Sequence, residues 1–173
     1  RHDRIRAELQ EAIQRNIMRG LSLPAGIIVA PGVNGHTAEL DTPPKVDVDA
    51  AKKLLAKAGY PSGFDVRFSC PNNRYVNDEE VCQAIVAMWA RIGVKAQLVA
   101  ENMATFSQKF QNFDSSLYML GWGVATYDAQ YTIQSLVRTR TTGADGNFNF
   151  SKISDPVVDR LTDAMKSETD VAK

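Results

Sequence analysis

The sequence has few cysteines, few histidines and no long apolar run. Its 173 residues include two of each, Cys70 and Cys82 and His2 and His36. Two cysteines exclude a disulfide-rich scaffold, and two separated histidines form no metal-ligand cluster. No apolar segment approaches the ~20 residues that cross a bilayer, and the first ten residues lack the apolar centre of a signal peptide.

Neither sign of charge is in excess. Lys plus Arg and Asp plus Glu number 20 each, and no basic block exceeds Lys52-Lys53, so we expect no nucleic-acid partner. With 44% hydrophobic residues the chain can bury one core, which predicts a single domain over residues 1–173. Both ends fall inside amphipathic helix patterns, so we expect a piece of a longer protein.

The N-terminal third combines helix patterns with turns. Apolar residues at helical spacing predict a helix over 3–19, and the turn-rich segment 20–46 is expected to be irregular, with a short strand over 27–30. A second helix is predicted over 48–58, because Asp47 suits the N-cap and Gly59 suits the left-handed position after the last turn.

A strand is predicted next, over 64–70. Phe64, Phe68 and Cys70 lie on its apolar face, in alternation with polar residues, and Pro71 closes it. This inward position favours a buried thiol at Cys70 over a disulfide with Cys82, although the disulfide is geometrically conceivable.

The remaining elements alternate between helix and strand. We predict a helix after Asp78 as N-cap, a strand over 94–100, a helix from Thr105 to Gln111, and a strand over 117–120 whose two apolar faces make it central. Two further helices are expected after the caps Asp128 and Asp155, the last burying Val158, Leu161 and Met165. The order predicts an α/β fold with a largely parallel or mixed sheet flanked by helices.

Ligands of such sheets bind beyond the carboxyl ends of the strands, here in the loops 70–77, 100–105 and 121–128. The first loop offers amides, a guanidinium fork for a carboxylate and an aromatic ring with a polar tip. The ligand-binding candidates in it are Asn72, Arg74, Tyr75 and Asn77. The alternative is that these residues only hold the loop; it is favoured for any single Asn, whereas for Arg74 and Tyr75 the two interpretations are equal.

Trp122 stands between two glycines at the end of the predicted third strand. The glycines leave room beside the ring, and Trp89 suits the core better because it lies on a helical apolar stripe. We therefore predict Trp122 as a wall of the ligand pocket.

Enzyme motifs are absent. The sequence has no GxGxxG, Walker loop or nucleophile elbow, and a nucleophile set of Cys70, His36 and an Asp is disfavoured because a strand-face cysteine usually packs. We expect a binding protein without catalytic residues, cofactor or metal. The alternatives are a small nucleotide-dependent α/β enzyme and an effector-sensing domain of a regulator.

Five stretches carry a resemblance to a known family: IQRNIMRGLSLPAG, AKKLLAKAGYPSGF, PNNRYVNDEEVCQAIVAMWARIGVKAQL, MLGWG and NFSKISDPVVDRL. They resemble the second lobe of family 5 extracellular solute-binding proteins, the dipeptide, oligopeptide and nickel class of ABC importers. The resemblance implies a two-lobed type II architecture. It implies a monomeric protein that is periplasmic or extracellular. It also implies capture of a peptide-like or other small polar solute by hinge closure, and delivery to a membrane permease.

The resemblance also bears on the ligand. In members that bind peptides, an Asp shortly after the GW element pairs with the α-ammonium group, and the matching position here is Ala125. Asp128 matches the next acidic position. We therefore expect ligands without a free α-amine, unless a shift of the loop brings Asp128 into that role.

Overall fold

The computed structural model describes residues 4–43 and 47–170, which form two compact units. The sheet unit lies within Arg1–Gly26 and Thr42–Gly121. The α5–α6 unit lies within Ile27–Asp41 and Trp122–Lys173 and is named for its helices α5 (Ala129–Leu136) and α6 (Pro156–Met165). The single domain over residues 1–173 stays a prediction, and His2 lies outside the described residues.

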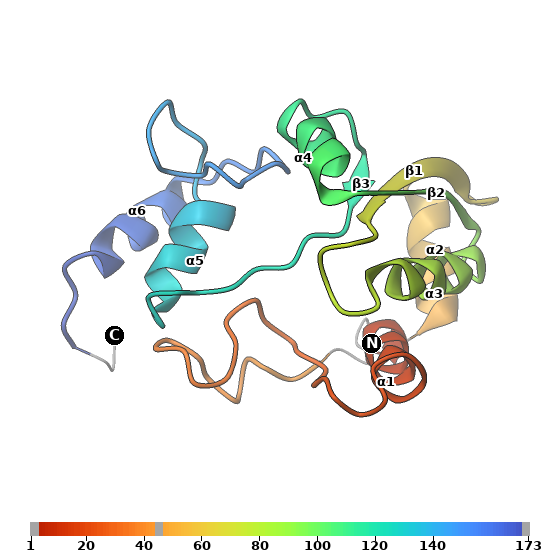
Figure 1. The fold of residues 1–173 in the computed structure, drawn as a ribbon, viewed down its shortest axis with the longest axis horizontal. Helices are drawn as coiled ribbons and strands as arrows, with labels where there is room; N and C mark the ends of the chain where they lie inside the picture. The colour runs from red at the N-terminus through yellow and green to blue at the C-terminus, as the bar shows by residue number, and fades with distance from the viewer. Residues whose placement is uncertain (1–3, 44–46, 171–173) are drawn as a thin grey trace. The chain divides into compact units, whose positions relative to one another are not determined.

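The sheet unit has the predicted alternation of strands and helices. Its elements are α1 (Arg4–Asn16), α2 (Val48–Lys57), β1 (Phe64–Pro71), α3 (Asp78–Ala90), β2 (Val94–Glu101), α4 (Met103–Gln111) and β3 (Leu117–Tyr118). The three strands are parallel in the order β2-β1-β3. Figure 1 shows α3 on one side of these strands and α4 on the other, which confirms the α/β fold with helices flanking a small parallel sheet.

Each face of the sheet is covered by one of these helices. On the α3 face, Phe68 is 3% exposed and its ring lies 5.1 Å from that of Trp89, so the predicted core role of Trp89 is confirmed. On the other face, Phe110 of α4 stacks with Tyr118 at 6.2 Å. The side chains packed around the α3 face are Ile85, Val86, Ala96, Leu98, Leu117 and Met119.

The prediction that the strand over 117–120 is central is wrong. β3 is a two-residue edge strand that pairs only with β1 in the described sheet, through Phe68–Leu117 and Ser69–Tyr118. It is apolar on both faces because α3 covers one face and α4 the other, which an edge position does not prevent.

The preference for a buried thiol at Cys70 is also wrong, because Cys70 and Cys82 form a disulfide. Both residues are fully buried, and their Cα atoms lie 6.6 Å apart. Strand alternation correctly predicted that Cys70 faces inward. The α3 residue that it faces is Cys82, so the buried position leads to a disulfide and not to a free thiol. A disulfide that closes a loop of this size stabilises a fold by about 3 kcal/mol relative to the reduced chain.

The α5–α6 unit keeps its predicted helix starts. Asp128 caps α5 by accepting from the Gln130 N–H, and Asp155 caps α6, which opens with Pro156. The expected buried stripe of α6 is wrong: Leu161 is 56% and Met165 38% exposed. The fully buried residue of this helix is Thr162, whose hydroxyl donates to the Val158 carbonyl.

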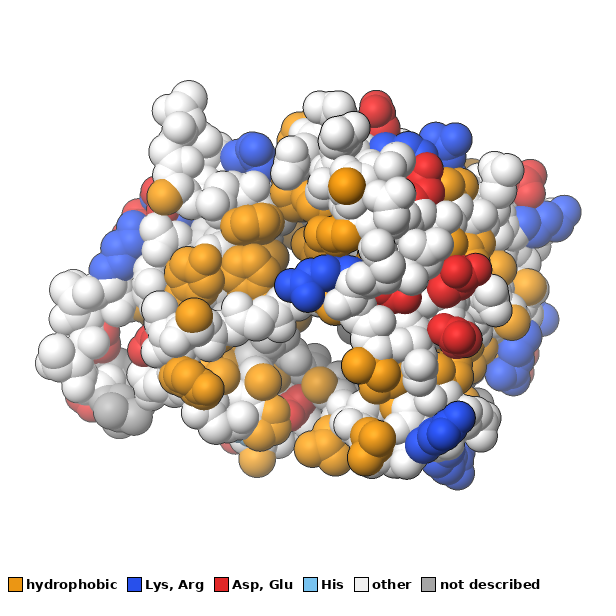
Figure 2. Space-filling model, viewed as in Figure 1, with side chains coloured by type: hydrophobic (Ala, Val, Ile, Leu, Met, Phe, Trp, Pro, Cys, Tyr) orange, Lys and Arg blue, Asp and Glu red, His pale blue; other side chains and the backbone are white. Residues whose placement is uncertain are grey.

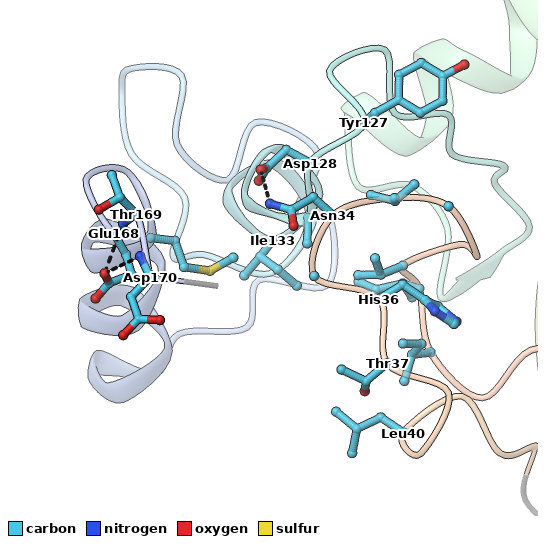
Figure 3. Close-up of a pocket in the computed structure, with 18 residues that line it drawn as sticks. Asn34, His36, Thr37, Leu40, Tyr127, Asp128, Ile133, Glu168, Thr169 and Asp170 are labelled. Atoms are coloured by element: carbon cyan, nitrogen blue, oxygen red, sulfur yellow. Dashed lines mark hydrogen bonds between the residues drawn. The ribbon is translucent and has the colours of Figure 1, made fainter. Parts of the chain in front are cut away.

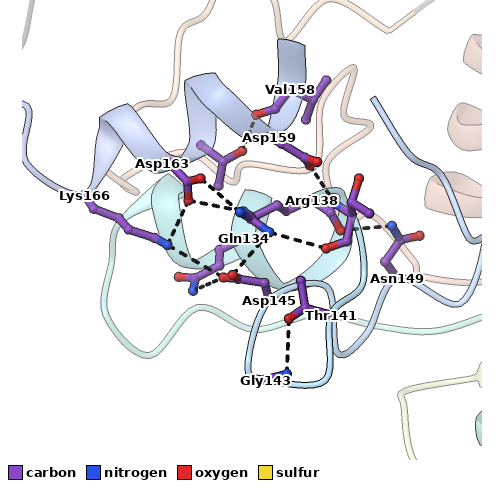
Figure 4. Close-up of polar contacts among 12 residues, drawn as sticks. Gln134, Arg138, Thr141, Gly143, Asp145, Asn149, Val158, Asp159, Asp163 and Lys166 are labelled. Carbon is purple, nitrogen blue, oxygen red and sulfur yellow. Dashed lines mark hydrogen bonds and ion pairs between the residues drawn. The ribbon is translucent and has the colours of Figure 1, made fainter. Parts of the chain in front are cut away.

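Ion pairs join the segment that follows α5 to α6 (Figure 4). The Arg138 guanidinium contacts Asp163 at 2.9 Å and Asp145 at 3.2 Å, and Lys166 contacts Asp163 at 2.9 Å. Hydrogen bonds from Arg138 and then from Lys166 lower the pKa of Asp163 to about 2. The fully buried Asn149 donates to three backbone carbonyls beside this network. Polar contacts therefore hold much of this unit together.

Segment 27–30 does not form the expected strand. Its residues are irregular, and the nearest strand-like contact is the isolated bridge between Asn34 and Asp128. No helix within residues 4–43 and 47–170 has the length and apolar character that a bilayer crossing requires. Acidic and basic side chains are interspersed on the face in Figure 2, as the balanced composition predicts.

Candidate functional site

The loop of residues 72–77, which we call the β1–α3 loop, follows the carboxyl end of the central strand. Asp78 organises it: its carboxylate accepts from the N–H groups of Arg74 at 2.9 Å and of Tyr75 and Glu79 at 3.0 Å. Asp78 is only 5% exposed. Burial would raise the pKa of Asp78, but these N–H donors hold it below its ordinary value.

The prediction that Asp78 is an N-cap is wrong in its detail. Asp78 is the first residue of α3, and the cap position belongs to Asn77, which has a φ of 53° and makes no side-chain cap bond. The Asp78 carboxylate instead turns back toward the N–H groups of the preceding loop. An aspartate at the start of a helix was correctly predicted, but Asp78 bonds mainly to the N–H groups of Arg74 and Tyr75, which precede the helix.

Arg74 and Tyr75 lie side by side in this loop. The guanidinium carbon of Arg74 is 5.4 Å from the centre of the Tyr75 ring, and the Tyr75 hydroxyl donates to the Gly121 carbonyl at 3.3 Å. A side chain at Gly121 would collide with that ring, because its Cβ would lie 2.6 Å from Tyr75. In the described part of the chain no hydrogen bond or ion pair engages the exposed Arg74 guanidinium, so its donors are available to a solute.

The side chains of Asn77 and Asn73 make hydrogen bonds within the protein, whereas the side chain of Asn72 is exposed. Asn77 donates its side-chain amide to the Ile17 carbonyl at 2.9 Å, which favours the loop-holding alternative for this residue. Asn73, outside the predicted set, accepts from the Met103 N–H at 2.8 Å and so ties the loop to the start of α4. The Asn72 side chain is exposed, while its backbone N–H donates to Glu101.

Trp122 belongs to the α5–α6 unit, where it lies in an aromatic cluster. Its ring stacks on Tyr131 at 5.6 Å and meets Phe148 edge-on at 5.2 Å. Its indole N–H donates to the hydroxyl of the buried Thr132 at 3.2 Å. The ring is half-buried, so one part of it serves this cluster and another part is exposed.

Asp128 lies beside Asn34 (Figure 3). One carboxylate oxygen accepts from the Gln130 N–H at 2.8 Å, and the other accepts from the Asn34 side chain at 2.9 Å. The Asn34 amide and then the Gln130 N–H hold the pKa of Asp128 below its ordinary value. Asp128 therefore stays ionised at neutral pH with both oxygens engaged. Ala125 is exposed.

The α5–α6 unit also contains a pocket of about 1300 Å³ that no sequence pattern predicted (Figure 3). It is lined by segment 27–40, by the start of α5 and by the residues that follow α6. Its wall includes His36, whose Nε2 lies 2.9 Å from Asp41. The turn APGVNG was the available signal, because it brings Asn34 to Asp128, but no local pattern predicts that pairing.

The seven predicted site residues are thus divided between the units. Asn72, Arg74, Tyr75 and Asn77 lie in the sheet unit, and Trp122, Ala125 and Asp128 lie in the α5–α6 unit. Among the described residues, no group of three or more His, Cys, Asp or Glu side chains is placed to hold a metal ion. The chemistry on offer is recognition by a guanidinium, amides and aromatic rings.

Comparison with known proteins places the chain in a family. The model of the bacterial extracellular solute-binding proteins, family 5 (middle region), matches residues 10–144. Heme-binding protein A of Haemophilus influenzae is 26% identical over 160 residues, which cover 88% of this chain and 28% of that protein. Glutathione-binding protein GsiB of Shigella flexneri is 27% identical over 143 residues, covering 77% and 28%.

A solved structure agrees with these relatives. The binding protein AgaA of A. tumefaciens R10, in complex with agropinic acid, superimposes with a TM-score of 0.81 at 26% identity, covering 97% of this chain and 35% of AgaA. The fold is that of a type II periplasmic binding protein. The chain spans about 28% of the length of both curated relatives. It belongs to the family 5 bacterial extracellular solute-binding proteins.

Proposed function

We propose that this chain is part of the solute-binding component of an ABC importer, which captures a peptide-like or other small polar solute and delivers it to a membrane permease. The observation that carries the proposal is the match of residues 10–144 to family 5. The exposed Arg74 guanidinium supports it: it lies beside Tyr75 after the carboxyl end of the central strand, and no residue of the described part of the chain pairs with it.

Capture works by differential affinity. The solute contacts a first lobe and this second lobe together only in the closed state, so it stabilises closure by the contacts that the open state lacks. The solute is bound and released without chemical change. A single lobe offers only part of these contacts, so the isolated chain binds more weakly than the full-length protein.

Arg74 is proposed to contact an anionic or carbonyl group of the solute. A guanidinium can donate two parallel hydrogen bonds to a carboxylate, which a lysine cannot copy. The Tyr75 ring beside it supplies an apolar surface with a polar tip, and Asn72 adds an exposed amide. Asn77 contributes less, because its amide already donates to Ile17. Trp122 is proposed as a pocket wall through the exposed part of its ring.

The solute is proposed to lack a free α-ammonium group. Ala125 has no charge to pair with an ammonium, and burying an unpaired ammonium is costly. Asp128 is the nearest carboxylate in sequence, but Asn34 and Gln130 already engage both of its oxygens. This engagement supports a structural role for Asp128 and leaves position 125 as the one that selects the solute.

A periplasmic or extracellular location is proposed for the full-length protein. The Cys70–Cys82 disulfide supports it, because disulfides form and persist in oxidising compartments and are rare in the cytosol.

Calorimetry on the full-length protein tests this function. The panel comprises glutathione, agropinic acid, heme, a dipeptide and the same dipeptide with its amine acetylated. We expect binding of at least one carboxylate-bearing member, preference for the acetylated dipeptide, and reversal of that preference by Ala125→Asp. Tight binding of the free dipeptide with rejection of the acetylated one would overturn the proposal for position 125 and point to Asp128. Failure of all solutes, in this panel and in a wider metabolite screen, would overturn the function.

A further inference from the structure

We infer that the β1–α3 loop is a preformed half of the solute site, and that Asp78 and the Cys70–Cys82 disulfide are the groups that position it. The inference rests on the proposed function, since it assigns the loop to solute capture. It adds positioning residues that do not touch the solute themselves.

Asp78 is the first positioning group. Its buried carboxylate accepts from the N–H groups of Arg74 and Tyr75 through the same oxygen, at 2.9 and 3.0 Å, and from Glu79 through the other. Hydrogen bonds to an ionised acceptor are about twice as strong as neutral ones. The two residues that present side chains to a solute therefore have their backbone fixed by one buried charge.

The disulfide is the second positioning group. Cys70 is the penultimate residue of β1, Cys82 lies in α3, and the two are 12 residues apart in sequence. The bridge therefore closes a ring that contains the whole β1–α3 loop and Asp78. A crosslink of this kind removes open conformations of the segment that it encloses. The loop keeps its ends together even when its hydrogen bonds open.

Two further contacts tie the loop to neighbouring elements. Asn73 accepts from the Met103 N–H at the start of α4, and the Tyr75 hydroxyl donates to the Gly121 carbonyl. Both partners belong to the sheet unit. The backbone is thus fixed at several points, whereas the Arg74 guanidinium is exposed and has no hydrogen-bonding partner in the described residues.

This arrangement reduces the cost of capture. A segment that is ordered before binding loses less conformational entropy when the solute arrives, so the same contacts give a higher affinity. Loosening the loop should weaken binding even when every group that touches the solute is intact.

Hydrogen exchange of the full-length protein without solute tests the preformed loop. The variants are Asp78→Ala and the isosteric Asp78→Asn, which keeps one side-chain oxygen as acceptor. The control is Asp47→Ala, which removes a cap bond to Ala50 in the same unit, away from the loop. We expect the Arg74 and Tyr75 amides to exchange at least about tenfold faster in Asp78→Ala, partly restored in Asp78→Asn and unchanged in the control. Unchanged exchange in Asp78→Ala would overturn the inference.

Calorimetry then tests the effect on capture, with the tightest-binding solute of the panel above. We expect Asp78→Ala, and separately the double variant Cys70→Ala/Cys82→Ala, to weaken binding by about tenfold, and Asp47→Ala to leave it unchanged. Should Asp78→Ala fail to fold, Asp78→Asn and the cysteine variant decide the outcome. If the wild-type protein binds and Arg74→Ala weakens binding while these variants do not, the inference is wrong and the proposed function stands. If the wild-type protein binds nothing, the proposed function is wrong and hydrogen exchange still decides whether the loop is preformed.

Discussion

The two sets of candidate solute-binding residues are held in opposite ways. In the β1–α3 loop the backbone is fixed by Asp78, while the Arg74 guanidinium has no hydrogen-bonding or ion-pair partner among residues 4–43 and 47–170. In residues 122–128 the side chains themselves make internal contacts: Trp122 bonds Thr132, and Asp128 bonds Asn34 and Gln130. Substitution of Arg74 should therefore change affinity, whereas substitutions of Trp122 and Asp128 should change stability first.

The largest expected effect is the loss of stability on substitution of Trp122. Trp122→Ala removes a ring that packs against Tyr131 and Phe148, so the free energy of unfolding should fall by about 3 kcal/mol. Trp122→Phe keeps an aromatic ring but loses the hydrogen bond to Thr132, and should cost about 1 kcal/mol. Urea unfolding followed by circular dichroism measures both. Equal, negligible losses would show that Trp122 serves the pocket alone.

Substitution of Arg74 should instead lower the affinity for the solute and leave stability nearly unchanged. Arg74→Ala should weaken solute binding by about 1.5 to 3 kcal/mol, since a charge-assisted hydrogen bond is lost, with little change in melting temperature. The matched control is Arg67→Ala, an exposed arginine of β1 that precedes the loop. Calorimetry and thermal unfolding on the same samples separate the two quantities. A lowered melting temperature at unchanged affinity would make Arg74 structural.

Asp128 should behave as a helix cap. Asp128→Ala removes the bond to Gln130 and should cost about 1 kcal/mol of stability, while Asp128→Asn, which also caps well, should cost less. Affinity for the acetylated dipeptide should not change in either variant. A loss of affinity larger than the loss of stability would assign Asp128 to the solute instead.

Acid should affect the α5–α6 unit through its carboxylates. The pKa of Asp163 is lowered to about 2, and those of Asp128 and Asp159 are also lowered. A depressed pKa contributes stability that is present above the unfolded value and is lost as the pH falls through the folded value. The loss should therefore occur between about pH 4 and pH 2.

The two tryptophans allow each unit to be followed in acid. Trp89 lies in the sheet unit and Trp122 in the α5–α6 unit, so Trp89→Phe and Trp122→Phe each leave one reporter. The Trp122 emission should change at a higher pH than that of Trp89. In the sheet unit the pKa of Asp78 is lowered by N–H donors of the loop, and the disulfide crosslinks the segment that contains Asp78. If the Trp89 emission changed at a higher pH than the Trp122 emission, the α5–α6 unit would not be the more acid-sensitive of the two.

The features that the sequence predicted correctly depend on neighbouring residues. Asp47 and Asp155 were recognised as caps because a capping side chain bonds an N–H two or three residues away. The alternation that placed Phe68 and Cys70 inward is equally local. The βαβαβ order followed from such elements in sequence, and the family resemblance added the architecture.

The features that the sequence missed depend on distant residues. Asn34 bonds Asp128 across 94 residues, and Asn77 bonds Ile17 across 60. The edge position of β3 also depends on which strand pairs with β1, and no pattern within residues 117–120 carries that information. The disulfide depended on which α3 residue faces Cys70.

The most direct test of solute capture by the β1–α3 loop is the side-chain Nε–H resonance of Arg74 in the full-length protein, followed by NMR. It is recorded while the tightest-binding carboxylate solute of the panel is added. We predict a saturable shift of the Arg74 resonance, with that of Arg67 unchanged, because only Arg74 donates to the solute carboxylate. An unchanged Arg74 resonance at saturation, with shifts confined to residues 122–128, would contradict the account.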